Sequence, residues 1–433
     1  MKNKMGIISD DLTGANDSGV QLAKKNLSTS VVFDYTNSSK EISSDVLILD
    51  TDSRAKKEEE AHKSVVEAAS FLKHYGYKHL YKKLDSTLRG NLEAELSAIE
   101  SVYNPDMIVI APAYPKMRRQ TINGHHFVDG VIITETEFSK DPKTPVEESF
   151  LPNLLNSKNN RNIKLLNKEV WRKSKEEISN IIQSSLMEGN KWFVCDAATE
   201  EDLINIAKLF VEQNKSIVWA GSAGLIEHLP GILNLSSSSI KEKEEIDIEN
   251  TLIVSGSLSQ VTKKQLYKVD SLQNSYFMQV NPIDLINGSY RLDEFMQMVE
   301  QNKEHNHFVL YVEADDANRK SAIEAGKMLG LSKNDVSEAI SNGLGIISTH
   351  IVKNAPFIQG VILTGGDTAK AVCRALGVTE MELYMEIEPG LPFGKIRTEN
   401  NNYWAVTKAG GFGQEDSLIK ALEFLINNRR VIV

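Results

Sequence analysis

Two adjacent carboxylates near the start of the chain are the first residues that could do chemistry. Asp10 and Asp11 end an apolar run, and a Thr13-Gly14 turn leads into a predicted helix that carries a further acid, Asp17. In open α/β proteins, buried strands deliver polar side chains to their C-terminal ends, where ligands bind. Asp, Asn and Thr also favour helix N-termini, so the segment fits a capped helix start equally well. Other segments of the chain favour chemistry.

A second polar segment, residues 81–92 (YKKLDSTLRGNL), follows a predicted strand. Lys83 and Arg89 supply cations for an anionic group. Asp85 and Ser86 supply a carboxylate and a hydroxyl that suit the alcohol groups of a sugar. The alternative is an ordinary strand-to-helix loop in which Asp85 or Ser86 caps the helix.

Further polar residues follow the third predicted strand and a proline-stiffened loop. Arg54 comes shortly after the strand 46–50, and its guanidinium fits a carboxylate with two hydrogen bonds. Residues 111–146 form a long polar stretch that contains the adjacent histidines His125 and His126. Neighbouring side chains of a strand point apart, so a metal site at this pair is disfavoured and contact of one histidine with a ligand is the better interpretation. A polar stretch of this length in a compact domain is more often functional than idle.

Glycine-rich turns follow three predicted strands in the second half of the chain. They are VSGSLS at 254–259, LTGGDT at 363–368 and TKAGGFG at 407–413. Small residues at a helix N-terminus leave backbone N–H groups open to an anion, which makes a phosphate-binding turn. Three such strand exits in one domain favour a nucleotide site. The chain has neither a GxxxxGK[ST] loop nor a GxGxxG motif after a strand, which disfavours a dehydrogenase.

The composition is that of a globular protein in a reducing compartment. The chain has 433 residues, too many for one ordinary domain, with 41% hydrophobic and 25% charged residues. A net charge of −10 argues against nonspecific nucleic-acid binding, although local lysines and arginines could still bind an anionic substrate. The two cysteines, Cys195 and Cys373, lack the spacing of metal ligands. Because no signal-peptide core or membrane-length apolar span is found, a cytoplasmic location is expected.

Short apolar runs alternate with helical patterns in both halves of the chain, which predicts α/β domains with largely parallel sheets flanked by helices. The polar segment 236–250 (SSSSIKEKEEIDIEN) lacks a core pattern and is predicted to be a linker. Two domains are therefore expected, residues 1–235 and 251–433, with the active site in the cleft between them. The predicted strands are residues 6–9, 30–33, 46–50, 79–84, 107–111, 192–196, 217–220, 251–254, 277–280, 308–313, 360–363 and 403–407.

A sugar-acid pocket in one domain and phosphate turns in the other favour phosphoryl transfer to a hydroxyl. That reaction needs an acid to accept or orient the hydroxyl proton, and cations or Mg²⁺ for the transferred group. An aspartyl phosphatase is disfavoured, because it needs Asp-x-Asp after the first strand and Leu12 occupies the third position here. A non-catalytic sensor of a sugar acid or nucleotide is the alternative of another class, and it would not need so many glycine turns.

Motifs from end to end of the chain resemble the four-carbon acid sugar kinases, a family long catalogued as a domain of unknown function. The matching stretches are SDDLTGANDSGV (9–20), KKLDSTLRGN (82–91), APAYPKMRRQT (111–121), ETEFSKDPKTPV (135–146), SGSLSQVT (255–262), LTGGDTA (363–369), EIEPGLPFG (386–394) and TKAGGFG (407–413). The resemblance implies an ATP-dependent kinase that phosphorylates the terminal C4 hydroxyl of a tetronate. The second and fourth stretches look more like D-threonate and D-erythronate kinases than like 3-oxo-tetronate kinases, which are the alternative within the family.

The resemblance also implies roles for particular residues, with the acid sugar in the N-terminal domain and ATP in the C-terminal domain. The implied acid-sugar contacts are Asp11, Arg54, Lys83, Asp85 and Ser86, and the implied nucleotide contacts are Ser255, Gly365, Gly366, Asp367, Thr368 and Gly410. Asp10 and Asp11 are the candidates for the catalytic base. Asp367 is a candidate for Mg²⁺ or for the reacting hydroxyl, and the sequence does not rank the three acids.

The interpretation from residue chemistry agrees with this assignment. Arg54 or Lys83 would bind the substrate carboxylate, Asp85 its hydroxyls, and the glycine amides the phosphates. The expected ligands are a sugar acid and ATP accompanied by Mg²⁺, with no separate metal site, nucleic acid or membrane. A homodimer is an expected possibility that the sequence does not decide.

Overall fold

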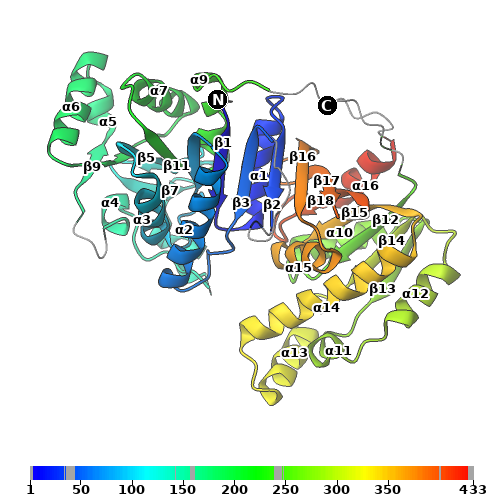
Figure 1. The fold of residues 1–433 in the computed structure, drawn as a ribbon. Helices are drawn as coiled ribbons and strands as arrows, with labels where there is room; N and C mark the ends of the chain where they lie inside the picture. Colours follow the sequence, from blue (N-terminus) through cyan, green and yellow to red (C-terminus); the bar gives the residue numbers. More distant parts are fainter. Residues whose placement is uncertain are drawn as a thin grey trace. The chain divides into compact units, whose positions relative to one another are not determined.

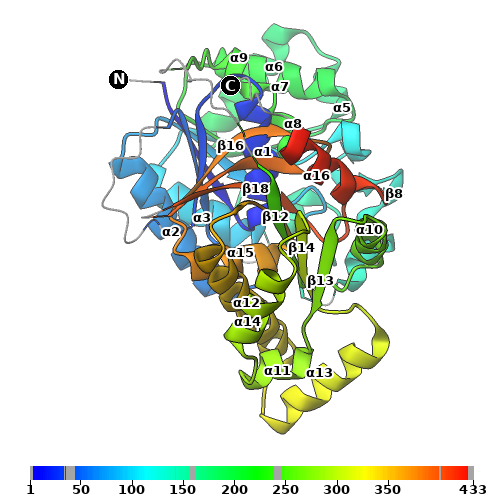
Figure 2. The same cartoon turned by 90° about the vertical axis from the view of Figure 1, so that its right-hand side faces the viewer.

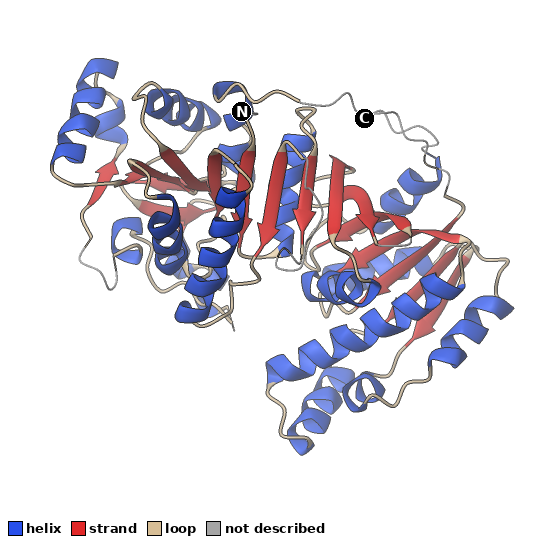
Figure 3. Ribbon diagram, viewed as in Figure 1, coloured by secondary structure: helices blue, strands red, loops and turns tan. Residues whose placement is uncertain are grey.

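The computed structural model divides into two compact units, residues 1–240 (the N-terminal unit) and 241–433 (the C-terminal unit), each with its own set of strands (Figure 1). The structure describes residues 3–33, 35, 44–141, 143–156, 161–237, 246, 248–398 and 401–427. Most of the predicted linker, residues 238–245 and 247, lies outside the described residues. In each unit helices flank the sheet (Figure 3), so the predicted α/β fold class is confirmed.

The main sheet of the N-terminal unit is parallel throughout, with the described strands in the order β2-β3-β1-β4-β11-β5-β10-β9. Every residue of β1 is buried, as expected for a parallel strand covered on both faces. The strands are β1 Met5–Ser9, β2 Thr29–Val32, β3 Val46–Asp50, β4 His79–Lys83, β5 Met107–Ala111, β9 Ile163–Leu166, β10 Trp192–Cys195 and β11 Ile217–Gly221.

Helices α2 and α3 pack against each other on one face of this sheet (Figure 1). Leucines and valines of both helices join the core formed by Ile8, Leu47 and Leu80 of the sheet. The helices are α1 Leu12–Ala23, α2 Glu58–His74, α3 Leu92–Tyr103, α4 Leu151–Leu154, α5 Lys168–Trp171, α6 Lys175–Met187, α7 Glu200–Val211, α8 Ala223–Ile226 and α9 Leu229–Ile232.

The strand order places three loops at one edge of the sheet. β1 lies between β3 and β4, and Ser9 pairs with both Asp50 and Lys83. The three strands therefore end at the same level, and the residues that follow them must lie near one another. The chain leaves β1 toward β2 and later crosses back to β4, so this edge is a topological switch point, where ligands of open α/β sheets bind.

A small antiparallel sheet, β6 Arg119–Ile122, β7 His125–Val128 and β8 Val131–Ile132, occupies part of the long polar stretch. These three strands were not predicted from the sequence. Three short 3-10 helices, Pro115–Met117, Ile133–Glu135 and Glu137–Lys140, complete this stretch.

The sheet of the C-terminal unit is parallel in β13-β14-β12-β15-β18 and ends in two antiparallel strands, β17 and β16. Ser255 pairs with Thr364, and Thr364 with Lys408, so the three glycine-rich turns start from strand ends at one level. The strands are β12 Asn250–Ser255, β13 Ser275–Gln279, β14 His307–Tyr311, β15 Ile358–Thr364, β16 Glu380–Glu386, β17 Pro392–Arg397 and β18 Asn402–Lys408.

A long helix, α14, dominates one face of the C-terminal unit. It packs against α15, while α11 and α13 lie against it farther along (Figure 2). The helices are α10 Gln260–Asp270, α11 Pro282–Asn287, α12 Leu292–Gln301, α13 Asp316–Met328, α14 Lys333–Asn354, α15 Gly366–Leu376 and α16 Ser417–Asn427. None of the helices in the described part of the chain has the length and apolar character needed to cross a membrane.

Candidate active site

The guanidinium of Arg54 joins the two adjacent carboxylates that follow β1. Its Nε donates to Asp10 Oδ2 at 2.7 Å, and its Nη2 donates to Asp11 Oδ1 at 2.7 Å. Asp11 also caps α1, because its Oδ1 accepts the N–H of Gly14 at 2.9 Å. The interpretation of Asp11 as a helix cap is therefore confirmed. The same residue also lies at the edge of the sheet where the polar residues after β1, β3 and β4 gather.

The two acids differ in exposure. The Asp10 side chain is 3% exposed and that of Asp11 21% exposed. Burial raises the pKa of Asp10, but the charges of Arg54 and Lys82 outweigh it and hold this pKa below its ordinary value. Asp10 is thus an enclosed, ionised partner of Arg54, whereas Asp11 keeps access to a ligand.

Lys83, the last residue of β4, is a buried cation with hydrogen-bonding capacity to spare. Its Nζ donates to the carbonyl of Leu84 at 2.9 Å, and no carboxylate of the described residues lies within ion-pair distance. An ammonium group has three donors. Because Arg54 is occupied by two acids, Lys83 is the better placed of the two cations to bind an anionic group.

The loop after β4 is held by ion pairs around Asp85. The carboxylate accepts hydrogen bonds from Thr87 Oγ1 at 2.5 Å and from Arg89 Nε at 2.6 Å. Burial raises the pKa of Asp85, but Arg54 and Arg89 overcome this and hold the pKa well below its usual range. Asp85 therefore stays ionised and can accept hydrogen bonds from hydroxyl groups.

Gly90 lies where no side chain fits. Its φ of 104° is unfavourable for other residues, and a Cβ there would lie 3.1 Å from Asp10 Oδ2 and 3.5 Å from Arg54 Cγ. The glycine thus lets the loop after β4 close over the Arg54–Asp10 pair.

The two adjacent histidines both hydrogen-bond to protein groups, and contact of either ring with a ligand stays a prediction. His126 is fully buried, and its Nε2 donates to the carbonyl of Ser86 at 2.9 Å while Nδ1 accepts from Thr121 at 3.2 Å. Burial lowers its pKa to about 4, so the ring is neutral. His125 lies 2.9 Å from Ser149 Oγ through its Nδ1. His126 is therefore a support for the Ser86 loop.

The three glycine-rich turns of the C-terminal unit contact one another. A Cβ on Gly256 would lie 2.5 Å from Thr368 Oγ1, and one on Gly410 would overlap Ser257 Oγ. Within the described residues, the buried hydroxyls of Ser255 and Thr364 have no hydrogen-bond partner. Buried polar atoms are nearly always satisfied, so unpaired hydroxyls beside these turns are suited to a bound ligand.

A buried lysine shapes the third turn. The Nζ of Lys408 donates to the carbonyl oxygens of Ala409 at 2.8 Å, Gly410 at 3.2 Å and Phe412 at 3.1 Å. Thr262 of α10 donates to the Gly410 carbonyl as well, at 2.6 Å. Burial lowers the pKa of Lys408 to about 8, a shift that Glu388 opposes. We call this arrangement the carbonyl clamp of Lys408.

The carbonyl clamp orients the amide groups of the turn. The C=O and the following N–H of a trans peptide point in opposite directions. Carbonyls that face the ammonium therefore turn the N–H groups of Gly410, Gly411 and Gly413 away from it. Gln265 pins the same loop by donating to the carbonyls of Phe412 at 3.1 Å and Gln414 at 2.7 Å. Glycine N–H groups directed out of a fixed loop form an anion-binding concavity.

The second turn opens α15 with its first N–H groups available to an anion. Gly365 precedes the helix with φ 98°, and Asp367 in the first turn is exposed. No group of three or more His, Cys, Asp or Glu side chains that could hold a metal is found in the described ranges. Mg²⁺ commonly uses one or two carboxylates together with substrate phosphates. Asp367 fits that pattern as a single protein ligand.

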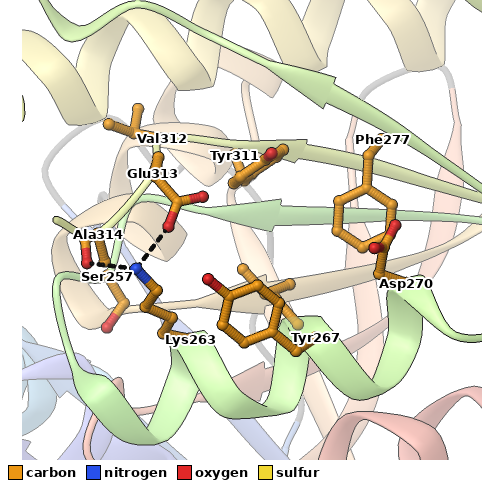
Figure 4. Close-up of a pocket in the computed structure, with 10 residues that line it drawn as sticks. Ser257, Lys263, Tyr267, Asp270, Phe277, Tyr311, Val312, Glu313 and Ala314 are labelled. Carbon is orange, nitrogen blue, oxygen red and sulfur yellow. Dashed lines mark hydrogen bonds and ion pairs between the residues drawn. The ribbon is translucent and has the colours of Figure 1, made fainter.

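A small pocket of about 80 Å³ lies beside Ser257 on the α10 side of the sheet (Figure 4). Lys263 reaches from α10 to Glu313, with an Nζ to Oε1 distance of 2.8 Å. Tyr267 and Tyr311 line the same pocket. The ion pair and the two rings therefore line the space on this side of the first turn.

Comparison with known proteins accounts for both units. Residues 5–229 match the family model of a sugar-binding N-terminal domain, and residues 252–418 match that of a nucleotide-binding C-terminal domain. The chain is 32% identical to a D-threonate kinase of Salmonella typhimurium, over 98% of each protein. The chain belongs to the four-carbon acid sugar kinase family. The predicted family is confirmed, and with it the enzyme class, a kinase of four-carbon sugar acids.

Other relatives of this acid sugar kinase differ in their named substrate. It is 28% identical to a D-erythronate kinase of Heliobacterium modesticaldum, over 97% of this chain and 96% of the relative. It is 24% identical to a 3-oxo-tetronate kinase of Pseudomonas savastanoi, over 97% of both. The crystal structure of Haemophilus influenzae protein HI1011 superposes with a TM-score of 0.78 at 23% identity, over 97% of this chain and 100% of that protein. This similarity shows a shared fold.

The acid sugar kinase brings its sequence-predicted residues together in two places. Those expected to contact the acid sugar, Asp11, Arg54, Lys83, Asp85 and Ser86, lie at one edge of the N-terminal sheet. Those expected to contact the nucleotide, Ser255, Gly365, Gly366, Asp367, Thr368 and Gly410, lie at the strand ends of the C-terminal sheet. Their roles in binding stay predictions. Sequence reasoning missed Lys408, Thr262 and Gln265, although a lysine directly before a glycine turn was a visible signal.

Proposed function

We propose that this chain is an ATP-dependent kinase that phosphorylates the C4 hydroxyl of D-threonate or D-erythronate. The observation that carries the proposal is the 32% identity to a D-threonate kinase across 98% of both proteins. The identity to a 3-oxo-tetronate kinase is lower, at 24%, and makes that substrate the alternative. We assign acid-sugar binding to residues 1–235 and nucleotide binding to residues 251–433.

In this proposal Lys83 binds the tetronate carboxylate. Its ammonium is buried, and within the described chain it is bound to a single carbonyl oxygen. Asp85, held ionised by Arg54 and Arg89, accepts hydrogen bonds from the hydroxyls of the sugar acid, and Ser86 adds a hydroxyl. We assign Arg54 to holding Asp10 and Asp11 in place rather than to binding the substrate carboxylate, because its guanidinium donates hydrogen bonds to both acids.

We assign the base to Asp11 rather than Asp10, because Asp11 is the more exposed of the two. Its carboxylate accepts the proton of the C4 hydroxyl as the hydroxyl oxygen attacks the γ-phosphorus of ATP. One oxygen–phosphorus bond forms and the bond from the γ-phosphorus to the bridging oxygen breaks. The products are the 4-phosphotetronate and ADP. Positioning and charge stabilisation supply most of the catalysis in reactions of this kind.

The nucleotide phosphates are assigned to the three glycine-rich turns. The supporting features are the N-terminal N–H groups of α15, the outward N–H groups of the carbonyl clamp and the unpaired Ser255 hydroxyl. Mg²⁺, accompanying ATP, would neutralise charge on the transferred group, with Asp367 as its protein ligand.

The test is an assay of ADP release with D-threonate, D-erythronate, L-threonate, L-erythronate and a 3-oxo-tetronate as acceptors. We expect turnover with D-threonate or D-erythronate and the highest kcat/KM for one of them. Turnover with the 3-oxo acid alone would establish the alternative substrate. Binding of ATP with no turnover on any of the five acids would favour a non-catalytic sensor. We further expect a cytoplasmic enzyme, and light scattering will distinguish a homodimer from a monomer.

A further inference from the structure

One buried carboxylate of the N-terminal unit takes no part in the mechanism proposed above. Glu95, in the first turn of α3, is 2% exposed, and its Oε1 accepts a hydrogen bond from Ser53 Oγ at 2.5 Å. Ser53 directly precedes Arg54 in the chain. We propose that Glu95 is a positioning residue for phosphoryl transfer, and that it acts through Ser53 on the segment that carries Arg54. The inference rests on the proposed function, in which Asp11 is the base.

Ser53 is tied to the two adjacent acids by the main chain. The N–H groups of Ser53 and Arg54 both donate to the carbonyl oxygen of Asp10, at 3.0 Å and 3.2 Å. The side chain of Arg54 then returns to the same residue, with Nε 2.7 Å from Asp10 Oδ2, and its Nη2 lies 2.7 Å from Asp11 Oδ1. A displacement of Ser53 would therefore move the guanidinium relative to both carboxylates.

The turn before Ser53 depends on contacts with other parts of the unit. Asp52 has a φ of 48°, in the left-handed region that residues with a side chain seldom occupy. Residues persist in this region where the surrounding structure holds them there, and they are concentrated at functional sites. Tertiary contacts must therefore hold Ser53 in place.

The start of α3 supplies two such contacts. Glu95 accepts the hydroxyl of Ser53, and Nδ2 of Asn91 donates to the carbonyl oxygens of Ser53 and Lys56, both at 3.0 Å. Glu95 is itself held on both sides. Its N–H donates to the Asn91 carbonyl at 2.9 Å, and Lys82 Nζ lies 2.9 Å from its Oε2. The hydroxyl and the carbonyl of Ser53 are thus both fixed to one end of one helix.

Stability alone does not explain a carboxylate at this position. A buried ion pair can often be replaced by apolar side chains of similar volume without loss of stability. A fully satisfied polar network, by contrast, holds its members in one arrangement. Glu95, Lys82 and Ser53 are all buried, and both carboxylate oxygens of Glu95 have partners. The network is therefore suited to fixing the geometry of the segment that carries Arg54.

The expected consequence is confined to the catalytic step. Substrate binding is assigned to Lys83 and Asp85, whose hydrogen-bond partners lie in the loop after β4. Loss of the contact between Ser53 and Glu95 should therefore lower kcat and leave the KM for the tetronate unchanged. Because a misplacement of about 1 Å can cost about 100-fold in rate, we expect kcat to fall about 10- to 100-fold.

Two independent changes break the contact. Ser53→Ala removes the donor hydroxyl. Lys82→Met/Glu95→Leu removes the acceptor together with its cation, so that neither charge is left without a partner in the interior. Ser30→Ala is the matched control, because the Ser30 hydroxyl is also buried in the N-terminal unit and lies 2.7 Å from Ser44 Oγ.

Steady-state kinetics, urea unfolding and calorimetric titration with ADP are measured on each variant. We expect both changes to lower kcat with unchanged KM values for the tetronate and ATP and unchanged ADP affinity. Ser30→Ala should keep the wild-type kcat, although it too loses a buried hydrogen bond. The triple variant Ser53→Ala/Lys82→Met/Glu95→Leu should lose no more kcat than the more impaired of the two, since both changes act at one contact.

The wild-type kcat in Ser53→Ala or in Lys82→Met/Glu95→Leu would overturn the inference. It would equally be overturned by a fall in kcat of the same size in Ser30→Ala, which would indicate a general loss of stability. Multiplying effects in the triple variant, or a higher KM for the tetronate at unchanged kcat, would also overturn it. Absence of turnover by the wild-type protein on every four-carbon sugar acid would overturn the proposed function, and the inference with it.

Discussion

The ammonium of Lys82 lies 2.9 Å from the Glu95 carboxylate, and both side chains are buried. Lys82 also donates to the carbonyl of Lys83 at 2.9 Å, and Glu95 accepts a hydrogen bond from Ser53 Oγ at 2.5 Å. Burial and the negative charge of Asp10 raise the pKa of Glu95, and the positive charge of Lys82 lowers it. The net result is a pKa above the ordinary value of a glutamate. This pair ties α3 and β4 to the segment that carries Arg54.

Lys82→Met should strongly destabilise the N-terminal unit, because it leaves a buried carboxylate without its partner. The expected loss is about 3–5 kcal/mol of unfolding free energy. The double variant Lys82→Met/Glu95→Leu should recover most of it, since no buried charge remains. Urea denaturation followed by tryptophan fluorescence measures this, because three of the four tryptophans (Trp171, Trp192 and Trp219) belong to the N-terminal unit. Equal stability of the single and double variants would contradict the role of the pair.

Asp11→Asn should keep the fold and nucleotide binding but lose most turnover. Asn is as good an N-cap as Asp, so α1 stays capped, whereas the amide cannot accept the substrate proton. The expected fall in kcat is about 10²–10⁴-fold. Asp52→Asn is the control, because Asp52 is exposed at the same sheet edge and its φ of 48° suits asparagine. Full activity of Asp11→Asn would remove this acid from the mechanism.

Lys83→Met should raise the KM for the tetronate and leave the KM for ATP unchanged. Hydrogen bonds to a charged group contribute about 1.5–3 kcal/mol, which corresponds to about 10- to 150-fold. Steady-state kinetics with each substrate varied in turn will show which constant changes. The control is Lys78→Met, which removes an exposed lysine just before β4. A rise confined to the KM for ATP would place Lys83 on the phosphates instead.

Lys408→Met should weaken nucleotide binding by releasing the carbonyl clamp. With the carbonyls of Ala409, Gly410 and Phe412 no longer held, the glycine N–H groups lose their common direction, and we expect about a tenfold weaker ADP affinity, or about 1.4 kcal/mol. Because the pKa of Lys408 is about 8, the wild-type affinity should fall above pH 8 and that of the variant should not. Lys264→Met, at an exposed position of α10, serves as control in the same calorimetric titrations. A pH-independent wild-type affinity would argue against the clamp.

His126 should make the N-terminal unit less stable in mild acid. Its pKa is about 4 in the folded protein, below the ordinary 6.5, so between these values the unfolded chain binds a proton that the folded protein does not. The free energy of unfolding therefore has its full value above pH 6.5, and it falls by about 1–3 kcal/mol as the pH drops toward 4. His126→Gln should flatten this dependence in pH-resolved thermal unfolding. His307→Gln is the matched control, since His307 has a similarly lowered pKa in the C-terminal unit and should not alter the N-terminal transition.

Local patterns were enough to find the strands and the polar residues that follow them. All predicted strands are present, with ends within two residues of those observed. The exceptions are informative. β16 and β17 were missed because they form an antiparallel edge with mixed polar and apolar residues, and β6, β7 and β8 lie in a stretch interpreted as a functional loop. β9 was missed as well, because it is a short edge strand in which only Leu166 is buried.

Hydrophobic periodicity and glycine turns act over a few neighbouring residues, so most of the elements, and the side chains at their ends, could be predicted from local patterns. Which of these side chains contact one another depends on the tertiary structure. Arg54 or Lys83 was expected on the substrate carboxylate, which stays untested, but only strand order places Arg54 against Asp10 and Asp11, more than 40 residues earlier in the chain. Lys408 likewise finds Thr262 only because β18 ends near α10. Such pairings depend on the order of strands in the sheet, which no local pattern encodes.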